Sequence, residues 1–341
     1  MPNLDYPYII AEVSGNHNGS LEKAKEIVTA ASDSGADCVK LQTYTADTMT
    51  IPSKRPDFMI QGGPWDGHNL YELYEWAQTP FEWQKPLFEH ARSLGLDCIS
   101  TPFDETAVDL LVSLECPMIK IASFELNDLP LVRYIAETGK PVIMSTGMAN
   151  LQEIRESVSL LRKYGSGDIT LLHCVSGYPT PPSEMNLLAI KSLYDEFGCT
   201  IGLSDHSLDN AVAIASIALG AKVIEKHFTL RRSDGGPDSA FSIEPNEMAA
   251  LVRDCNTAFN ALGTGDFDMQ PAEAQNVKFR RSIYVVRDIK AGDTFTEENI
   301  RRIRPGYGLA PKYFDQIIGK IARRDLKAGD PVTKDMIDVI P

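Results

Sequence analysis

Residues 200–228 read TIGLSDHSLDNAVAIASIALGAKVIEKHF and contain two short apolar runs on either side of a helical pattern. The runs Thr200–Asp205 and Lys222–Phe228 are too short for helices, whereas Leu208–Leu219 has a helical pattern. Continuous apolar runs of this length are typical of strands that are buried on both faces of a parallel sheet. The stretch therefore predicts a strand–helix–strand unit with polar residues at the end of each strand.

The same alternation extends over most of the chain. Six further apolar runs precede this unit, at Tyr8–Val13, Cys38–Thr43, Cys98–Phe103, Met118–Ser123, Pro141–Thr146 and Ile169–Cys174. Helical patterns accompany them at Leu21–Ser34, Phe81–Leu94 and Leu151–Tyr164, and a last one follows at Pro245–Leu262. Eight strand–helix alternations in about 260 residues predict a closed (βα)8 TIM barrel. An open sheet that binds a dinucleotide would show G-x-G-x-x-G after its first strand, where this chain has SGNHNG.

Composition argues against several classes of function. The formal net charge of −14 disfavours a nucleic-acid surface, which needs basic residues to neutralise phosphates. No apolar run is long enough for a membrane span, and the N-terminal sequence lacks the pattern of a secretory signal. The 6 cysteines form no C-x-x-C pair, so a reduced, cytoplasmic protein is expected. An anionic substrate would then need positive charge concentrated at its site.

A change of composition after Gly263 predicts that the barrel occupies residues 1–263 and is followed by a second unit. Residues 264–281 are polar and lack apolar periodicity, as expected of a linker. Beyond them, RDIKAGDTFTEENI at 287–300 returns as RDLKAGDPVTKDMI at 324–337. Two copies are too few for a solenoid. We expect residues 282–341 to form a small pseudo-symmetric domain whose halves pair face to face, and which docks elsewhere because its core is marginal.

Two histidines follow the last two predicted strands. His206 and His227 come after strands that are neighbours in a closed barrel, so their side chains could converge at the C-terminal mouth, where barrel active sites lie. Neutral imidazoles commonly ligate divalent metals, and Glu12 on the first strand would be the next neighbour. The spacing is equally consistent with histidines that only hydrogen-bond carbonyl groups at the barrel end.

Two lysines, Lys40 and Lys120, lie inside the otherwise apolar strands CVKLQT and MIKIAS. A buried lysine is costly unless it meets a negative group. A Schiff base is one functional interpretation, and binding of phosphate or carboxylate is another. A structural ion pair with Glu12, Asp104 or Glu125 is the alternative without a function. The presence of two lysines favours anion binding, because a Schiff base needs only one.

Hydroxyl, amide and aromatic side chains add further candidates. Several polar residues suit phosphate or sugar oxygens, although serines at strand ends are also common turn formers; they are Ser123, Ser145, Ser176, Ser204 and Asn186. A long segment, 44–79, interrupts the alternation, and insertions of this length are usually functional. The aromatic residues in and after it could line a sugar pocket, but we expect most of them to pack the loop: Trp65, Tyr71, Tyr74, Trp76, Phe81 and Trp83.

Seven ordered motifs resemble those of the sialic acid synthase family. They are IIAEVSGNHNGS, VKLQTYTADTMT, KIASFE, STGMAN, LLHCVSGYPTP, IGLSDHS and EKHFTLRRSDGGPDSAFS. The repeat-bearing tail, with IRPGYGL, looks like the C-terminal antifreeze-like (SAF) domain of that family. The resemblance covers nearly the whole chain. Within the family, NLYELYEWAQTPFEWQ and STPFDETAVDLL look most like the corresponding segments of pseudaminic acid synthases.

The resemblance implies an activity and roles for individual residues. Family members condense phosphoenolpyruvate with the open aldehyde form of an N-acylated amino sugar, release phosphate, and use a divalent metal, Mn2+ or Mg2+. The family's metal histidines fall on His206 and His227. Its phosphoenolpyruvate contacts fall on Lys40, Lys120, Ser123, Ser145, Asn186 and Ser204. Positions near the acceptor sugar fall on Glu12, Gln42, Tyr178 and Asp238. Either the metal or Glu12 is expected to activate the attacking water.

The resemblance also bears on specificity and assembly. Where neuraminate synthases have Asn in H-C-x-N-x-Y-P, this chain has Ser176, which agrees with a sugar other than the neuraminate precursor. The resemblance to pseudaminic acid synthases implies 2,4-diacetamido-2,4,6-trideoxy-L-altrose as that sugar. The precursors of neuraminate and legionaminate stay open as alternatives. The tail arginine that caps a partner's site in the family falls on Arg304, which implies a domain-swapped homodimer. A Schiff-base aldolase that uses Lys120, and a carbohydrate-binding module without catalysis, are rival interpretations.

Overall fold

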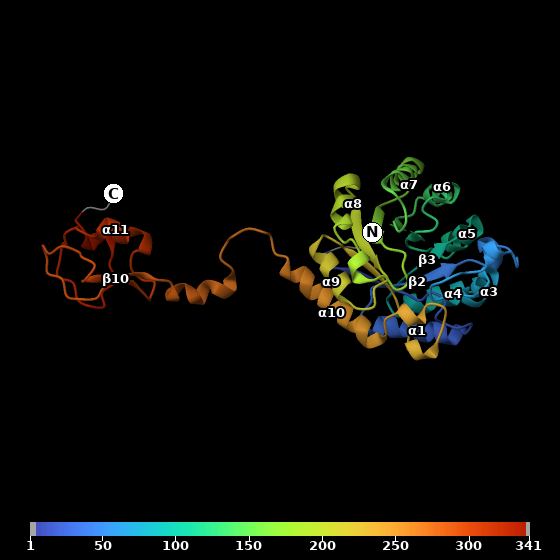
Figure 1. Cartoon of the computed structure of the whole chain (residues 1–341), viewed down its shortest axis with the longest axis horizontal. Coiled ribbons are helices and arrows are strands. Elements are labelled where there is room, and N and C mark those ends of the chain that lie inside the picture. The colour runs from blue at the N-terminus through green and yellow to red at the C-terminus, as the bar shows by residue number, and fades with distance from the viewer. Residues whose placement is uncertain (1–4, 339–341) are drawn as a thin grey trace. The chain divides into compact units, whose positions relative to one another are not determined.

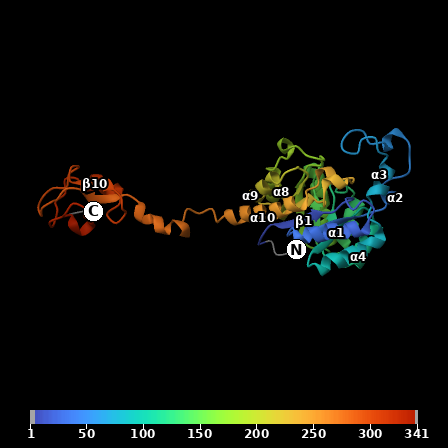
Figure 2. The same ribbon diagram turned by 90° about the horizontal axis from the view of Figure 1, so that it is seen from below.

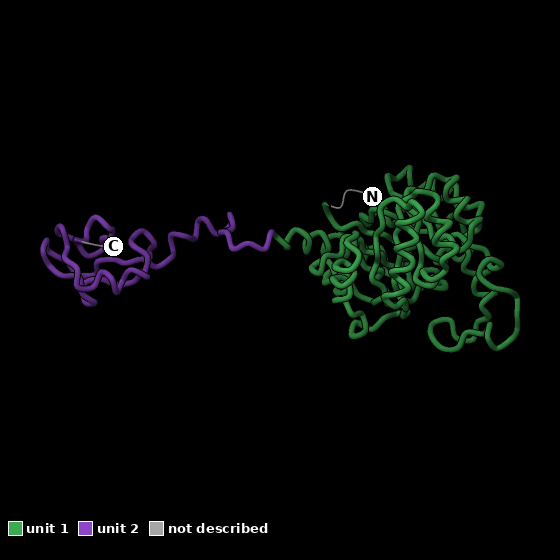
Figure 3. Tube along the Cα trace, turned by 90° about the horizontal axis from the view of Figure 1, so that it is seen from above, with its two compact units in different colours: residues 1–263 green, residues 264–341 purple. Residues whose placement is uncertain are grey.

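The computed structural model describes residues 5–338 and divides the chain into two compact units (Figure 1 and Figure 3). The first unit spans Met1–Gly263 and the second spans Thr264–Pro341. Within the described residues, no helix is both long and apolar enough to cross a membrane.

The first unit is built on a closed barrel in which the described strands β1 to β8 are parallel and follow one another in chain order. They are β1 (Tyr8–Glu12), β2 (Cys38–Thr43), β3 (Asp97–Pro102), β4 (Ile119–Ile121), β5 (Val142–Ser145), β6 (Ile169–Cys174), β7 (Thr200–Asp205) and β8 (Val223–His227). The barrel closes between β1 and β8, where Glu12 lies opposite His227. The predicted (βα)8 fold is therefore confirmed, and every strand ends within two residues of its predicted position.

Helices surround the barrel and cover its outer face (Figure 1). They are α1 (Leu21–Asp33), α4 (Phe81–Ser93), α5 (Glu105–Ser113), α6 (Leu129–Glu137), α7 (Leu151–Tyr164), α8 (Ala189–Phe197), α9 (Ala211–Ala218) and α10 (Pro245–Ala261). Side-chain caps fix several starts: Asp104 accepts a hydrogen bond from the amide of Ala107, and Asn150 accepts from the amides of Gln152 and Glu153. The buried core lies between the strands and these helices.

Helix α9 begins at Ala211, three residues after the predicted start at Leu208. The reason is a side chain from the neighbouring strand. Lys226 Nζ donates to the carbonyl oxygens of Ser207 at 2.6 Å and Asp209 at 3.0 Å. Those carbonyls therefore point at the lysine, and residues 207–210 form a turn instead of the first helical turn.

The segment 44–79 folds over the barrel mouth rather than forming a structureless loop. It contains α2 (Ala46–Met49) and α3 (Leu70–Ala77), and Figure 2 shows the loop between them extending beyond the barrel. Asn69 caps α3 through its side-chain oxygen, and its amide donates to the carbonyl of Ser53 at 2.7 Å. A single side chain thus closes the loop and starts the helix.

The second unit has its own core and confirms the expected pairing of the two sequence repeats. It contains the antiparallel strands β9 (Ser282–Val285) and β10 (Ile300–Ile303), the short helix α11 (Phe314–Ile317), and a 3-10 helix at Pro271–Phe279 within the segment expected to be a linker. Equivalent residues of the repeats exchange ion pairs, Lys290 with Asp325 at 2.8 Å and Lys327 with Asp288 at 2.7 Å. The halves therefore face each other about a pseudo-two-fold axis.

Candidate active site

The carboxyl ends of the barrel strands surround a cavity of about 510 Å³. Such a position is where barrel enzymes assemble their active sites. The structure brings eleven of the sequence-derived candidates into its lining: Glu12, Lys40, Gln42, Lys120, Ser123, Ser145, Tyr178, Ser204, His206, His227 and Asp238.

Strands β7 and β8 place their polar residues on alternate faces of the barrel wall. Ser204 and Glu225 are register partners, and Ser204 Oγ donates to Glu225 Oε1 at 3.1 Å on the cavity side. The next pair, Asp205 and Lys226, forms an ion pair of 2.7 Å with both side chains fully buried. Because side chains alternate along a strand, the following residue, His227, faces the cavity again.

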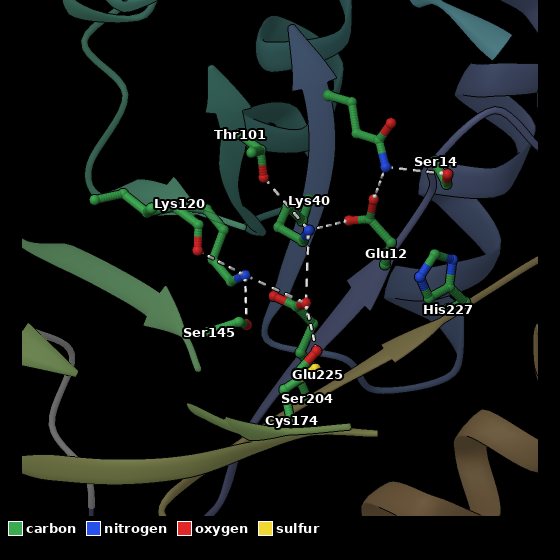
Figure 4. Close-up of polar contacts among 12 residues, drawn as sticks. Glu12, Ser14, Lys40, Thr101, Lys120, Ser145, Cys174, Ser204, Glu225 and His227 are labelled. Atoms are coloured by element: carbon green, nitrogen blue, oxygen red, sulfur yellow. Dashed lines mark hydrogen bonds and ion pairs between the residues drawn. The ribbon is translucent and has the colours of Figure 1, made fainter. Parts of the chain in front are cut away.

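Glu225 lies at the centre of the charged floor of the cavity (Figure 4). Its Oε1 is 3.5 Å from Lys40 Nζ and 3.7 Å from Lys120 Nζ. Lys40 also contacts Glu12 at 2.9 Å, and Lys120 donates to Ser145 Oγ at 2.7 Å. Glu225 is one of the polar residues at the strand ends of the sequence, but no role in the site was predicted for it. The signal that could have found it is the period of two in KVIEKHF, which puts it on the same face as His227.

Burial and pairing set the charges of these groups. Burial lowers the pKa of Lys40, but Glu12 and Glu225 raise it by more, so the amine stays protonated. Burial lowers the pKa of Lys120, and Glu225 offsets only part of this effect. Burial raises the pKa of Glu12 to about 7 against the opposing effect of Lys40. The pKa of Glu225 lies below its usual range because both lysines outweigh its burial. The floor is therefore a compact set of charges that already neutralise each other.

His206 and His227 converge as the barrel geometry requires, with ring centroids 5.4 Å apart. His206 Nδ1 lies 3.0 Å from the carbonyl oxygen of Val175, and since a carbonyl can only accept, this nitrogen carries a proton. His227 Nδ1 is buried without a hydrogen-bond partner, and burial holds the pKa of His227 well below its usual value.

These features fit a divalent metal. A neutral imidazole with an unpartnered buried nitrogen is a ready ligand, and the hydrogen bond from His206 to Val175 is the kind that orients a ligating ring. Within residues 5–338, no cluster of three or more His, Cys, Asp or Glu side chains is arranged to hold a metal by itself. A metal on this pair would therefore complete its coordination with substrate or water.

A row of hydrogen-bonded polar side chains, which we call the polar relay, lies on the side of the cavity near β1. Gln42 Nε2 donates to Glu12 Oε1 at 2.9 Å and lies 3.2 Å from Ser14 Oγ, which in turn donates to Asp238. Burial raises the pKa of Asp238 to about 6. Asp238 Oδ2 is 3.8 Å from His227 Nδ1, so the relay ends beside the histidine pair.

Comparison with known proteins identifies the family. The NeuB family matches residues 27–267, and the SAF domain matches residues 280–338. The chain belongs to the NeuB family. It is 46% identical to the pseudaminic acid synthase of Helicobacter pylori over 98% of this chain and 99% of that protein. It is 45% identical to the pseudaminic acid synthase of Campylobacter jejuni serotype O:2 over 95% of this chain and 94% of that protein.

A solved structure supports the same assignment. The N-acetylneuraminic acid synthetase of Leptospira borgpetersenii, crystallised with citrate, superposes with a TM-score of 0.73 at 30% identity, covering 82% of this chain and 95% of that one. The resemblance to the sialic acid synthase family and to its SAF domain is thus confirmed.

Three candidates of this NeuB-family chain lie outside the cavity lining. Asn186 is exposed in the segment just before α8, where its neighbour Met185 is buried and its backbone carbonyl accepts a hydrogen bond from His173 at 2.7 Å. Met185 therefore takes the inward position and Asn186 the outward one. Ser176 lies behind Gly147, where a Cβ would come within 2.3 Å of the serine oxygen. Arg304 is exposed on the second unit.

The aromatic residues divide between lining and packing. Trp65 and Tyr74 line the cavity. Trp83 packs edge-on against His17 at 5.6 Å, and Trp76 stacks on His68 at 6.2 Å. Tyr71 donates to Asp47 at 3.0 Å within the insertion. Tyr71 and Trp76 therefore pack within the insertion, as expected, whereas Trp83 packs outside it, and Trp65 and Tyr74 line the cavity.

Proposed function

We propose that this chain condenses phosphoenolpyruvate with 2,4-diacetamido-2,4,6-trideoxy-L-altrose in its open aldehyde form, giving a nine-carbon sugar acid and phosphate. The observation that carries the proposal is the pairing of two buried lysines with two buried histidines in one cavity. The full-length similarity to pseudaminic acid synthases supports the choice of sugar.

The lysines provide the binding site for phosphoenolpyruvate. Lys40 and Lys120 concentrate positive charge in one cavity of a protein whose net charge is −14. The hydroxyls of Ser123, Ser145 and Ser204 line the same cavity and would hydrogen-bond the bound anion. Charge-assisted hydrogen bonds to phosphate and carboxylate are the strongest contacts these side chains can make. Binding of the anion replaces part of the contact that each lysine makes with Glu225.

His206 and His227 would hold the divalent ion, Mn2+ or Mg2+, which when bound supplies Lewis acidity to the aldehyde oxygen. C3 of phosphoenolpyruvate forms the new bond to the aldehyde carbon, the C=O π electrons move to the aldehyde oxygen, which takes a proton from water and becomes a hydroxyl, and C2 becomes electron-poor. Glu12, with a pKa of about 7, is placed to take a proton from the water that adds to C2. The C2–O bond to phosphate then breaks, and phosphate leaves with the bonding electrons.

A phosphate-release assay with three acceptors tests the proposal. Phosphate release with the trideoxyaltrose derivative, at least ten times faster than with the acceptors for neuraminate or legionaminate, would support it. Faster release with either of those would give the function to that alternative instead. A lack of release with all three would favour the carbohydrate-binding module. Borohydride trapping of pyruvate on Lys120 would favour the Schiff-base aldolase.

We also propose that Arg304 acts in the site of a partner subunit within a domain-swapped homodimer. Its exposure on a unit that folds around its own core supports this role. Mixing inactive Arg304→Ala with inactive Lys120→Met should restore activity, because a mixed dimer contains one intact composite site. We place the reaction in the cytoplasm, since all 6 cysteines, each within the described residues, are free.

A further inference from the structure

The cavity has two chemically distinct halves. Its floor, at the strand ends, carries the charged residues described above. Its outer side is formed by the insertion 44–79, and each residue that this insertion contributes within the described chain is apolar or aromatic. We call four of them, Met49, Ile60, Leu70 and Leu73, the apolar wall.

The apolar wall is held in place by contacts within the barrel unit. Trp65, from the same insertion, donates its indole N–H to the carbonyl of Pro237 at 2.7 Å, next to Asp238 of the polar relay. The Trp65 ring lies 5.5 Å from the Tyr178 ring, and the Tyr178 ring lies 4.4 Å from the His206 ring. An aromatic path therefore runs from the histidine pair to the insertion that carries the wall.

A second set of contacts anchors the base of the insertion. Tyr44 packs edge-on against Tyr74 of α3 at 5.9 Å and against Phe103 after β3 at 5.2 Å. Ile60 is fixed in a hairpin, where its amide donates to the carbonyl of His68 at 2.9 Å and its carbonyl accepts from Gly67 at 3.0 Å. These contacts fix the insertion, and the four side chains of the apolar wall offer no hydrogen-bond partner; the tyrosine hydroxyls of the insertion belong to Tyr44 and Tyr74, outside the wall.

We infer that the apolar wall selects acceptor sugars with a methyl group at C6 over those with a hydroxymethyl group. The inference rests on the proposed function, because it takes the aldehyde end of the acceptor to lie at His206 and His227. A hydroxyl placed against the wall loses its water without gaining a partner, whereas a methyl group gains contact. An apolar pocket discriminates against one added hydroxyl by about 10- to 100-fold.

The test compares 2,4-diacetamido-2,4,6-trideoxy-L-altrose with the same sugar bearing a hydroxyl at C6. Both kcat/KM and the acceptor Kd, the latter measured by calorimetry without phosphoenolpyruvate so that no turnover occurs, are determined for four proteins. These are the wild type, Leu70→Asn, Ile60→Asn and the control Ile51→Asn. Ile51 belongs to the same insertion but is 60% exposed and lies outside the cavity lining. Circular dichroism verifies that each variant is folded.

The wild type and Ile51→Asn should prefer the deoxy sugar by about 10- to 100-fold. Leu70→Asn and Ile60→Asn should reduce that preference to a few-fold and improve Kd for the hydroxylated sugar. Equal constants for the two sugars in the wild type, or an unchanged preference in both wall variants, would overturn the inference. Failure of the proposed function has a different signature: no phosphate release with either sugar, while the ratio of Kd values still reports on the wall.

Discussion

Asp205 and Lys226 form a fully buried ion pair of 2.7 Å, and each immediately precedes one of the two histidines of the site. The pair lies at matching positions of β7 and β8, so it fixes the register in which the two strands deliver His206 and His227. Lys226 Nζ also donates to the carbonyl of Ser207 at 2.6 Å, which ties down the loop after β7. Along both strands, the structural ion pair faces away from the cavity, and the histidine that follows each of its members faces into it.

Removal of Lys226 should be strongly destabilising. Lys226→Met leaves Asp205 as a buried charge without its partner, which typically costs about 3–5 kcal/mol. Urea denaturation should show this loss, and the double variant Asp205→Asn/Lys226→Met should recover a large part of it. A single variant within about 1 kcal/mol of the wild type would contradict a structural role for the pair, since such a change is typical of an ordinary substitution.

Lys120 should be required for binding of phosphoenolpyruvate. Lys120→Met removes a buried cation from the anion site, and we expect the KM for phosphoenolpyruvate to rise by at least about 30-fold, in line with the loss of a buried charged hydrogen bond. The matched control is Lys191→Met, since Lys191 is exposed on α8 and forms an ion pair with Asp195 on the same helix. An equal KM in both variants would remove Lys120 from the anion site.

The stability of the empty protein should depend on pH through Glu125. Burial raises the pKa of this carboxyl to about 7, from 4.5 in the unfolded chain. The folded state therefore holds the proton more tightly, so the stabilising contribution is complete below pH 4.5 and is lost as the pH rises to 7. Glu125→Gln does not titrate, and its Tm should exceed that of the wild type increasingly between these values and level off above them.

The control for this pH effect is Glu184→Gln, because Glu184 is exposed. Its Tm should follow that of the wild type at every pH. A constant Tm difference between Glu125→Gln and the wild type from pH 4 to pH 8.5 would show that the carboxyl titrates alike in the folded and unfolded states.

The histidine pair should bind the metal directly. His206→Ala and His227→Ala should each abolish turnover that EDTA inhibits, and each should weaken Mn2+ binding measured by electron paramagnetic resonance at least tenfold. His90→Ala, a change on α4 outside the cavity, should leave both unchanged. Undiminished Mn2+ binding in both cavity variants would contradict the assignment.

Much of the fold was predictable because both faces of each barrel strand are buried. Runs such as Thr200–Asp205 stand out from their polar surroundings for that reason. The polar strand ends then indicated most of the cavity lining, since closure of the barrel brings them to one mouth.

What escaped prediction depends on contacts between distant residues. Helix α9 starts late because Lys226, on β8, donates hydrogen bonds to the carbonyl oxygens of Ser207 and Asp209. The centrality of Glu225 follows from its position between Lys40 and Lys120, on strands β2 and β4. Asn186 turned outward because Met185 fills the inward position. No local pattern specifies the start of α9 or the direction of Asn186, and the period of two in KVIEKHF indicates only which face Glu225 occupies, not its two lysine partners.

The central claim is that this cavity joins phosphoenolpyruvate to a sugar aldehyde and releases phosphate by breaking the C2–O bond. The most direct measurement follows 18O placed in the bridging position of phosphoenolpyruvate, with 2,4-diacetamido-2,4,6-trideoxy-L-altrose as acceptor. We expect the label in inorganic phosphate, released only when both substrates are present. Label retained in the sugar acid, or phosphate released without the acceptor, would contradict the account.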